Sequence, residues 1–268
     1  MTTRLPALFL GHGSPMTVIT DNPYRASFVA LGKDLPRPKA ILAISAHWET
    51  QDGKVHLTAG DAPRTIHDFG GFPQALFDMQ YPAPGSPELV DRVAGLLGEE
   101  RVVRDESWGF DHGTWGVLQP MYPAADIPTV QLGLDRTLDV DAHIAIGRAL
   151  APLRDEGVLI VGSGNVVHNL SLWRQSQGTQ PEWALDIGRR VVAAAKAGDD
   201  AALAHSAPDD RAAAMAINSA EHYLPLLYVV GARLPGDEVA VFNDDVDGAL
   251  SMTSFLVGDA ALLEGVVQ

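Results

Sequence analysis

Short apolar runs alternate with helix-like stretches along most of this chain, and this alternation limits what the chain can fold into. The runs lie at residues 7–10, 40–44, 129–132, 158–161 and 238–242. Continuous apolar runs of this length are typical of strands that are buried on both faces, as in a parallel sheet. We therefore predict an α/β fold in which a mostly parallel central sheet is flanked by helices.

The helix-like stretches between these runs have recognisable ends. Ser86-Pro87-Glu88 starts one that stops at Gly98, and Asp21-Asn22-Pro23 starts another. Both starts place proline in the first helical turn, directly after a side chain that can cap the helix. A further helix is expected over residues 141–154, with His143 off its apolar face.

No internal repeat, low-complexity tract or persuasive linker divides the chain, so residues 1–268 are expected to form a single domain. The alanine-rich stretch 181–216 is expected to form exposed helices on the outside of this domain. The stretch 53–87 is rich in Gly, Pro and Asp. We expect it to be a long loop over the functional site rather than a domain boundary.

The balance of charge excludes several kinds of partner. The chain carries 34 acidic and 19 basic side chains, which gives a formal net charge of −15 at pH 7. Without a cationic surplus, neither nucleic acid nor an anionic membrane surface is an expected partner. No apolar run approaches the roughly 18 residues of a membrane span, and the first residues lack the apolar core of a signal peptide. We expect a cytoplasmic protein that acts on a small neutral or zwitterionic molecule.

The chain contains no cysteine. Disulfides, thiolate metal sites and cysteine nucleophiles are therefore excluded, and any metal must be bound by nitrogen and oxygen. No serine lies in a Gly-x-Ser-x-Gly motif, and Pro15 directly after Ser14 argues against a nucleophile elbow there. A serine hydrolase is thus a poor fit, and a histidine-based metal site is the stronger prediction.

Two histidines follow predicted strands. His12 comes after the run 7–10, and His47 comes after the run 40–44. In open α/β sheets the ligand crevice lies at the carboxyl ends of the strands, so neighbouring parallel strands would bring both imidazoles to the same edge. Imidazole is the commonest protein ligand for first-row divalent metals. The structural alternative is that His12 caps a turn and that His47 is a buried core histidine.

His168 follows a third run, 158–161, after the loop Gly162-Ser163-Gly164-Asn165. We predict that it is a metal ligand or lies next to the ligands, and the alternative is a histidine that only starts a helix. The loop could also cradle a phosphate. It lacks, however, the lysine of a P-loop and the full Gly-x-Gly-x-x-Gly spacing.

Glu221 and His222 open the apolar stretch 223–228, which we predict to be a helix with Ser219 as its cap. A carboxylate in a first helical turn is favoured by the helix dipole without any function. A protonated His222 would gain nothing there, because this end of a helix disfavours added positive charge. A neutral, metal-bound imidazole suits the position better.

His112 lies in the segment Asp111-His112-Gly113-Thr114-Trp115-Gly116. We predict that it is a catalytic acid–base, because a histidine can accept and return a proton near neutral pH. The alternative is a loop histidine that is hydrogen-bonded to Asp111.

A further histidine, His67, lies among aromatic residues and glycines in the segment 65–73. This segment is expected to form the lip of a pocket or a structural loop, and Phe72 and Trp115 are expected to line the same pocket. The remaining histidines occupy ordinary polar contexts and are expected on the surface: His56, His143 and His205.

Six motifs, in order over nearly the whole chain, resemble those of the class III extradiol ring-cleaving dioxygenases, in particular the 4,5-DOPA dioxygenase-like branch. The motifs are Leu8-Phe9-Leu10-Gly11-His12-Gly13-Ser14-Pro15, Ser45-Ala46-His47-Trp48, His67-Asp68-Phe69-Gly70-Gly71-Phe72-Pro73, Gly109-Phe110-Asp111-His112-Gly113, Ser163-Gly164-Asn165-Val166-Val167-His168-Asn169-Leu170 and Glu221-His222-Tyr223-Leu224-Pro225-Leu226. Six motifs in sequence are far more specific than any one of them.

The resemblance implies a role for each histidine of these motifs. The positions of His12, His47, His168 and His222 match metal ligands, and that of His112 matches the acid–base. Relatives in the wider superfamily use two histidines and a glutamate, so Glu221 is a possible ligand in place of His222. One departure concerns this last ligand: the family tends to have a proline-rich run where this chain has Ile217-Asn218-Ser219-Ala220.

The implied reaction is the insertion of O2 into a DOPA-like catechol ring, which opens to a semialdehyde. Fe(II) would support activity, and Zn(II) is expected in isolated protein because affinity alone favours zinc over iron. Two other functions remain open at this point: a zinc-dependent hydrolase with the same histidine cluster, and a non-catalytic binding protein of the same fold. The expected partners are a small aromatic diol and O2, and the protein is expected to be a monomer or small homo-oligomer.

Overall fold

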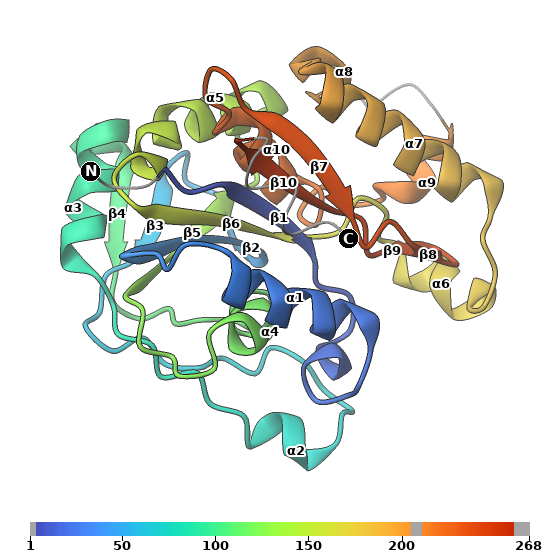
Figure 1. Ribbon diagram of the computed structural model, residues 1–268, viewed down its shortest axis with the longest axis horizontal. Coiled ribbons are helices and arrows are strands. Elements are labelled where there is room, and N and C mark those ends of the chain that lie inside the picture. The colour runs from blue at the N-terminus through green and yellow to red at the C-terminus, as the bar shows by residue number, and fades with distance from the viewer. Residues whose placement is uncertain (1–3, 205–210, 260–268) are drawn as a thin grey trace.

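One sheet forms the centre of the protein in the computed structural model, which describes residues 4–204 and 211–259 (Figure 1). Within these residues the sheet has eight strands. From one edge to the other they are β4 (Val102–Asp105), β3 (Val55–Thr58), β5 (Thr129–Asp135), β2 (Ala40–Thr50), β6 (Val158–Gly164), β1 (Ala7–Gly11), β10 (Ser254–Gly258) and β7 (Glu238–Phe242).

The four strands in the middle of the sheet are parallel. β1 pairs with β6, β6 pairs with β2, and β2 pairs with β5, all in the same direction. Every residue of β1, β5 and β6 is buried, as expected of strands that are covered on both faces. The prediction of an α/β fold with a mostly parallel central sheet is confirmed.

Strand β7 differs from the prediction, which placed it among the buried parallel strands. It is an edge strand, it runs antiparallel to β10, and its residues are exposed or half-buried. Between β7 and β10 the chain forms only a small hairpin of β8 (Val246–Asp247) and β9 (Leu250–Ser251). Parallel neighbours need a longer crossover, usually a helix, so this short connection requires antiparallel pairing.

Helices surround the sheet. They are α1 (Pro23–Asp34), α2 (Gln74–Phe77), α3 (Pro87–Leu97), α4 (His112–Met121), α5 (Val140–Leu150), α6 (Leu170–Ser176), α7 (Glu182–Ala197), α8 (Asp200–Ala204), α9 (Arg211–Ala216) and α10 (Leu224–Gly231), with short 3₁₀ helices at Pro15–Val18, Glu99–Arg101 and Ala151–Arg154. Among the described residues, none of these helices combines the length and apolar character that a bilayer crossing requires.

Two hydrophobic cores lie on opposite faces of the sheet. Ala7 and Phe9 of β1 belong to the core that includes α5 and α10, whereas Leu8 and Leu10 belong to the core that includes α1 and α4. In the view of Figure 1, α5 and α10 lie above the sheet and α1 and α4 lie below it. Alternate residues of one strand thus fill both layers, which is why its sequence reads as a continuous apolar run.

The predicted helix ends are largely confirmed. The side chain of Ser86 accepts a hydrogen bond from the backbone N–H of Leu89, and Gly98 ends α3 with a φ of 97°. Asn22 caps α1 in the same way. The helix predicted over residues 141–154 is divided into α5 and a 3₁₀ turn, because Pro152 has no N–H to continue the α-helical hydrogen bonds.

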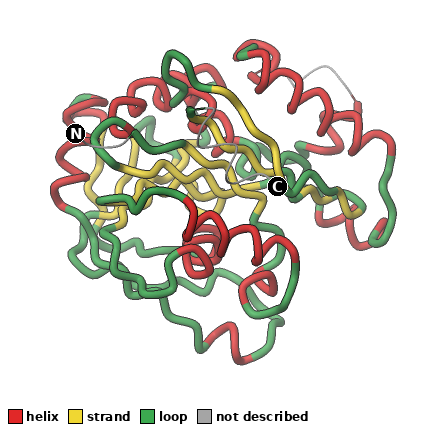
Figure 2. The backbone as a smooth tube through the Cα atoms, in the orientation of Figure 1, coloured by secondary structure: helices red, strands yellow, loops and turns green. Residues whose placement is uncertain are grey.

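The segment predicted as a long loop, residues 53–87, contains strand β3 and the short helix α2. Pro87 begins α3, and the rest of the segment is irregular, as the tube in Figure 2 shows. The predicted outer helices of residues 181–216 correspond to α7, α8 and α9, at the right of Figure 1.

His143 is not a surface residue, contrary to the prediction. It is 1% exposed, and its Nδ1 lies 2.9 Å from the hydroxyl of Tyr228. Helices α5 and α10 cross closely here, since a Cβ at Gly147 would lie only 2.3 Å from the carbonyl oxygen of Tyr228. Burial lowers the pKa of His143 to about 4. Of the other two, His56 is half-buried, and His205 lies outside the described residues.

A buried ion pair joins three separate parts of the fold. Arg154 is fully buried, and its guanidinium lies 2.5 Å from the carboxylate of Asp237. The same guanidinium donates hydrogen bonds to the backbone carbonyls of Leu5, Ala232 and Val257. It therefore links the chain before β1, the end of α10 and strand β10.

We expect Arg154→Met to lower the free energy of unfolding by about 3–5 kcal/mol, because it leaves Asp237 buried without a counter-charge. Arg92→Met is the matched control: it breaks an exposed ion pair with Glu156 and should cost less than about 1 kcal/mol. Urea denaturation at neutral pH measures both variants. Equal losses would contradict a structural role for the buried pair.

Candidate functional site

Three histidine rings meet at the carboxyl edge of the central strands. His12 directly follows β1, His47 lies in the last part of β2, and His222 precedes α10. One ring nitrogen from each lies within 4.8 Å of the others. The Nε2 atoms of His12 and His47 are 3.2 Å apart. The structure thus brings together three of the four histidines that sequence motifs assigned to a metal site.

An irregularity in strand β2 sets the position of His47. The pairing of β2 with β5 shifts register between Ile44 and Glu49. Such a bulge turns the side chains of a strand in new directions. The hydroxyl of Ser45 also accepts a hydrogen bond from the backbone N–H of His47. His47 therefore lies where β2 has left its regular pairing.

The outer nitrogen of each ring has a partner of its own. Nδ1 of His12 lies 3.0 Å from the hydroxyl of Ser163. Nδ1 of His47 lies 3.3 Å from Asp68, and Nδ1 of His222 lies 3.0 Å from Glu221. A carboxylate only accepts hydrogen bonds, so Nδ1 of His222 donates to Glu221 and the Nε2 of that neutral ring carries no proton. The contact of His47 with Asp68 is an electrostatic one, which favours the proton on Nδ1 of His47 in the same way. Metal-binding histidines are held by partners of this kind.

Burial keeps these rings neutral. It lowers the pKa of His12 and of His222 well below the usual value, and neighbouring imidazoles lower both further. The pKa of His47 falls to about 3, again chiefly because of burial, with a smaller contribution from His112. A neutral imidazole is the form that binds a metal. Nitrogen ligands at tetrahedral positions about 2.1 Å from a metal would lie roughly 3.4 Å apart, so the spacing of His12 and His47 fits.

His222 is held by a close backbone contact with β6. Its carbonyl accepts a hydrogen bond of 2.8 Å from the backbone N–H of Asn165. A Cβ at Gly164 would lie 2.1 Å from the same carbonyl oxygen, so only glycine leaves room. The predicted cap is wrong: α10 begins at Leu224, and Ser219 instead donates a hydrogen bond to Glu221.

His168 is stacked on His222 rather than grouped with the other two histidines. Their rings are 3.4 Å apart and tilted by only 8°. A ring nitrogen of His168 lies within 4.8 Å of a carboxylate oxygen of Glu221 and of a ring nitrogen of His222. His168 lies two residues before α6, and its backbone N–H donates to the carbonyl of Ala216. Burial lowers its pKa as well.

His112 is the first residue of α4, and its ring lies 4.0 Å from that of His47, centre to centre. The alternative of a hydrogen bond to Asp111 is wrong. Nδ1 of His112 and its backbone N–H each lie 2.9 Å from the carboxylate of Asp68. Burial raises the pKa of Asp68, but its contacts with His112 and His47 outweigh this and lower it to about 2.

Asp111 is instead the cap of α4. Its fully buried carboxylate accepts hydrogen bonds from Ser45, from Gln131 and from the backbone N–H of Thr114. Burial raises its pKa, and the charge of Asp68 adds to this. By joining the start of α4 to β2 and β5, Asp111 fixes the backbone that carries His112.

Aromatic rings adjoin His112. Phe69 meets it edge to face with ring centres 5.6 Å apart, and Phe72 lies behind Phe69 at 5.4 Å. Trp115 is buried and donates a hydrogen bond to the carbonyl of Ile66. His67 lies 5.7 Å from Trp115. The structure therefore groups the predicted pocket residues, but Phe69 is the aromatic side chain next to His112.

Sequence reasoning missed two neighbours of His112, Asp68 and Phe69. Both lie in the segment His67-Asp68-Phe69, from which only the histidine was chosen. The available signal was an acidic residue, Asp68, between two residues with ring side chains, His67 and Phe69. It could not show that the carboxylate faces His112, which lies 44 positions away in the chain.

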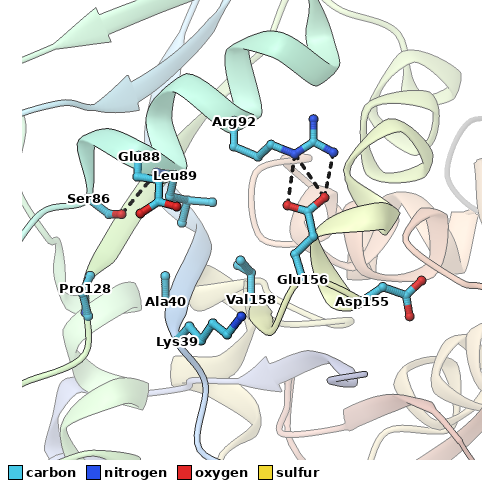
Figure 3. Close-up of a pocket in the computed structure, with 10 residues that line it drawn as sticks. All are labelled: Lys39, Ala40, Ser86, Glu88, Leu89, Arg92, Pro128, Asp155, Glu156 and Val158. Atoms are coloured by element: carbon cyan, nitrogen blue, oxygen red, sulfur yellow. Dashed lines mark hydrogen bonds and ion pairs between the residues drawn. The ribbon is translucent and has the colours of Figure 1, made fainter. Parts of the chain in front are cut away.

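A cavity of about 460 Å³ lies at the amino ends of the parallel strands β2 and β6 (Figure 3). Its lining includes Ala40 and Val158, the first residues of β2 and β6, and the ion pair of Arg92 and Glu156 crosses its rim. The histidines lie at the opposite, carboxyl ends of these strands. This cavity is therefore not part of the histidine site.

Histidines clustered at the strand ends of an α/β sheet are typical of a metal-dependent enzyme. Comparison with known families identifies the family to which this chain belongs. The sequence profile of the catalytic LigB subunit of aromatic ring-opening dioxygenases matches residues 6–246. This chain belongs to that family. The sequence-based prediction of a ring-opening dioxygenase is confirmed.

Individual relatives make the assignment more specific. The chain is 48% identical, over 96% of each chain, to a 4,5-DOPA dioxygenase extradiol of Escherichia coli. It is 37% identical to the protein of that name from Beta vulgaris, over 90% of this chain and 92% of the relative. A crystal structure of an uncharacterized Escherichia coli protein matches with a TM-score of 0.82 and 42% identity, covering 95% of this chain and 100% of that one.

We expect Gly164→Ala to weaken Zn(II) binding by the metal-free protein and to lower the free energy of unfolding by about 1–3 kcal/mol, because the added methyl group must displace the backbone of His222. Isothermal titration calorimetry and urea denaturation measure the two effects. Gly95→Ala is the control, since a Cβ there contacts nothing within 4 Å. Normal Zn(II) binding by Gly164→Ala would contradict this account of His222.

Proposed function

We propose that this protein is an extradiol dioxygenase that opens the ring of a DOPA-like catechol. In this reaction O2 cleaves the carbon–carbon bond beside the diol, and its two oxygen atoms end in the carboxylate and the aldehyde of the semialdehyde product. The observation that carries the proposal is the cluster of His12, His47 and His222 next to His112. The named relatives favour ring cleavage over a zinc hydrolase or a binding protein.

We assign the metal to the clustered imidazoles. His12, His47 and His222 would hold it, with His168 beside them as the fourth ligand that the family resemblance implies. Glu221 accepts a hydrogen bond from His222, which favours an orienting role for Glu221 over that of a replacement ligand. The proposed active metal is Fe(II), and Zn(II) would compete for the same nitrogen ligands. The bound metal would orient catechol and O2 and make the catechol easier to deprotonate.

His112 is the proposed acid–base. Because its Nδ1 donates to Asp68, its Nε2 is the nitrogen that can accept a proton from the catechol and return it as the ring opens. Phe69 lies against the same ring. Together with His67, Phe72 and Trp115, it would provide an apolar wall for an aromatic substrate and keep water from the reacting atoms.

The proposed partners are small molecules, an aromatic diol and O2. A formal charge of −15 supports this choice over nucleic acid. The cytoplasmic location and the state of monomer or small homo-oligomer stay predictions from the sequence.

We expect His112→Ala, loaded anaerobically with Fe(II), to consume O2 roughly 10²–10⁴-fold more slowly than wild type with L-DOPA, because it lacks the proton acceptor. His47→Ala should lose activity through loss of metal. An oxygen electrode and the yellow absorbance of the semialdehyde measure both. His56→Gln, which alters a histidine paired with Asp52 outside the cluster, is the control. Wild-type rates in both site variants would refute the assignment.

Exchange of the metal tests the choice of Fe(II). Protein stripped with a chelator should regain O2 uptake with Fe(II) and not with Zn(II), because iron can change its oxidation state and zinc cannot. Turnover should also stop when O2 is removed. A zinc-loaded protein that converts substrate without O2 would instead indicate a hydrolase.

A further inference from the structure

We propose that Asp68 is a positioning residue that orients the metal ligand His47 and the acid–base His112 with a single carboxylate. The proposal rests on the proposed function, since it uses the roles assigned there to the two histidines. Nothing in the sequence motifs gives Asp68 a role of its own.

The geometry of the carboxylate carries the proposal. One oxygen, Oδ2, lies 2.9 Å from Nδ1 of His112 and 3.3 Å from Nδ1 of His47. The other oxygen, Oδ1, accepts a hydrogen bond of 2.9 Å from the backbone N–H of His112. The two imidazole rings themselves are 4.0 Å apart. Asp68 therefore holds both rings and also the backbone at the start of α4.

The other acidic groups of the site are already committed elsewhere. Asp111 accepts hydrogen bonds from Ser45 and Gln131. Glu221 accepts them from Ser219 and His222. Within the described part of the chain, the one group of metal-ligand-type side chains that includes both His47 and His112 is completed by Asp68.

A shared carboxylate has a definite chemical consequence. It accepts a hydrogen bond from Nδ1 of His112, which leaves Nε2 of that ring able to take a proton. Its charge beside Nδ1 of His47 favours the proton on that nitrogen and leaves Nε2 of His47 able to bind a metal. Asparagine cannot replace it. If its amide oxygen faces the two rings, its amide nitrogen faces the backbone N–H of His112. The reverse orientation places N–H groups against both rings.

Asp68→Asn is the test, with Glu221→Gln as the matched comparison, since Glu221 contacts His222 and not His112. Competition with a chelator should show that Asp68→Asn weakens Zn(II) binding by the metal-free protein about 10–100-fold. Long-range ¹H–¹⁵N NMR spectra should show that His112 changes from the Nδ1-protonated tautomer to a mixture. Both measurements are independent of enzyme activity.

The kinetic test compares the factor by which His112→Ala lowers kcat in three backgrounds: the wild type, Glu221→Gln and Asp68→Asn. With Asp68 intact this factor should be roughly 10²-fold or more. It should stay so with Glu221→Gln, and it should shrink to nearly 1 with Asp68→Asn, because His112 is then no longer oriented. A residue that only stabilised the fold would leave the factor unchanged.

An unchanged His112 factor, unchanged Zn(II) affinity or an unchanged His112 tautomer in Asp68→Asn would each overturn the proposal. If urea denaturation shows that Asp68→Asn is unfolded, Asp68→Ser takes the place of that variant in all three measurements. Serine removes the carboxylate without adding an amide N–H. If the wild type consumes no O2 with any catechol, the proposed function fails. The Zn(II) affinity and the tautomer then still decide the role of Asp68.

Discussion

Burial of both faces of the parallel strands is the constraint on which the rest of this structure depends. With α5 and α10 on one face and α1 and α4 on the other, the side chains in the middle of β1, β2, β5 and β6 are shut off from solvent. Polar chemistry is therefore restricted to the strand ends, where the backbone leaves the sheet. His12 directly follows β1, and His47 lies at the register shift near the end of β2. The close approach of His222 to Gly164 brings a third segment to the same edge.

Burial at this edge also determines the chemistry of the imidazoles. Charged rings so close together in a site shielded from water would repel one another, so the rings are neutral and their lone pairs are available. The partners on the outer nitrogens, Ser163, Asp68 and Glu221, hold the rings in place before any ligand arrives. Such preorganisation lowers the cost of binding and of catalysis.

The loop before α2 contributes two residues of the site, Asp68 and Phe69. Both lie on irregular chain after β3, yet both contact His112 at the start of α4. Functional residues commonly lie on loops that a rigid scaffold positions. Here the scaffold includes the fully buried Asp111, which fixes the start of α4. His112 and His47 are thus carried by different elements and meet at one carboxylate.

Local patterns in the sequence determined the α/β class, the central strands, helix ends such as Ser86, and the presence of histidines at strand ends. These features depend on residues close together in the chain, where periodicity and capping act. Only the tertiary structure decided that Asp68 is the partner of His112, that His168 stacks on His222, and that His143 is buried. Each of these depends on how closely two segments that are far apart in the sequence pack together. The side-chain volumes and glycines of both segments set that spacing, so the local pattern of one segment cannot predict it.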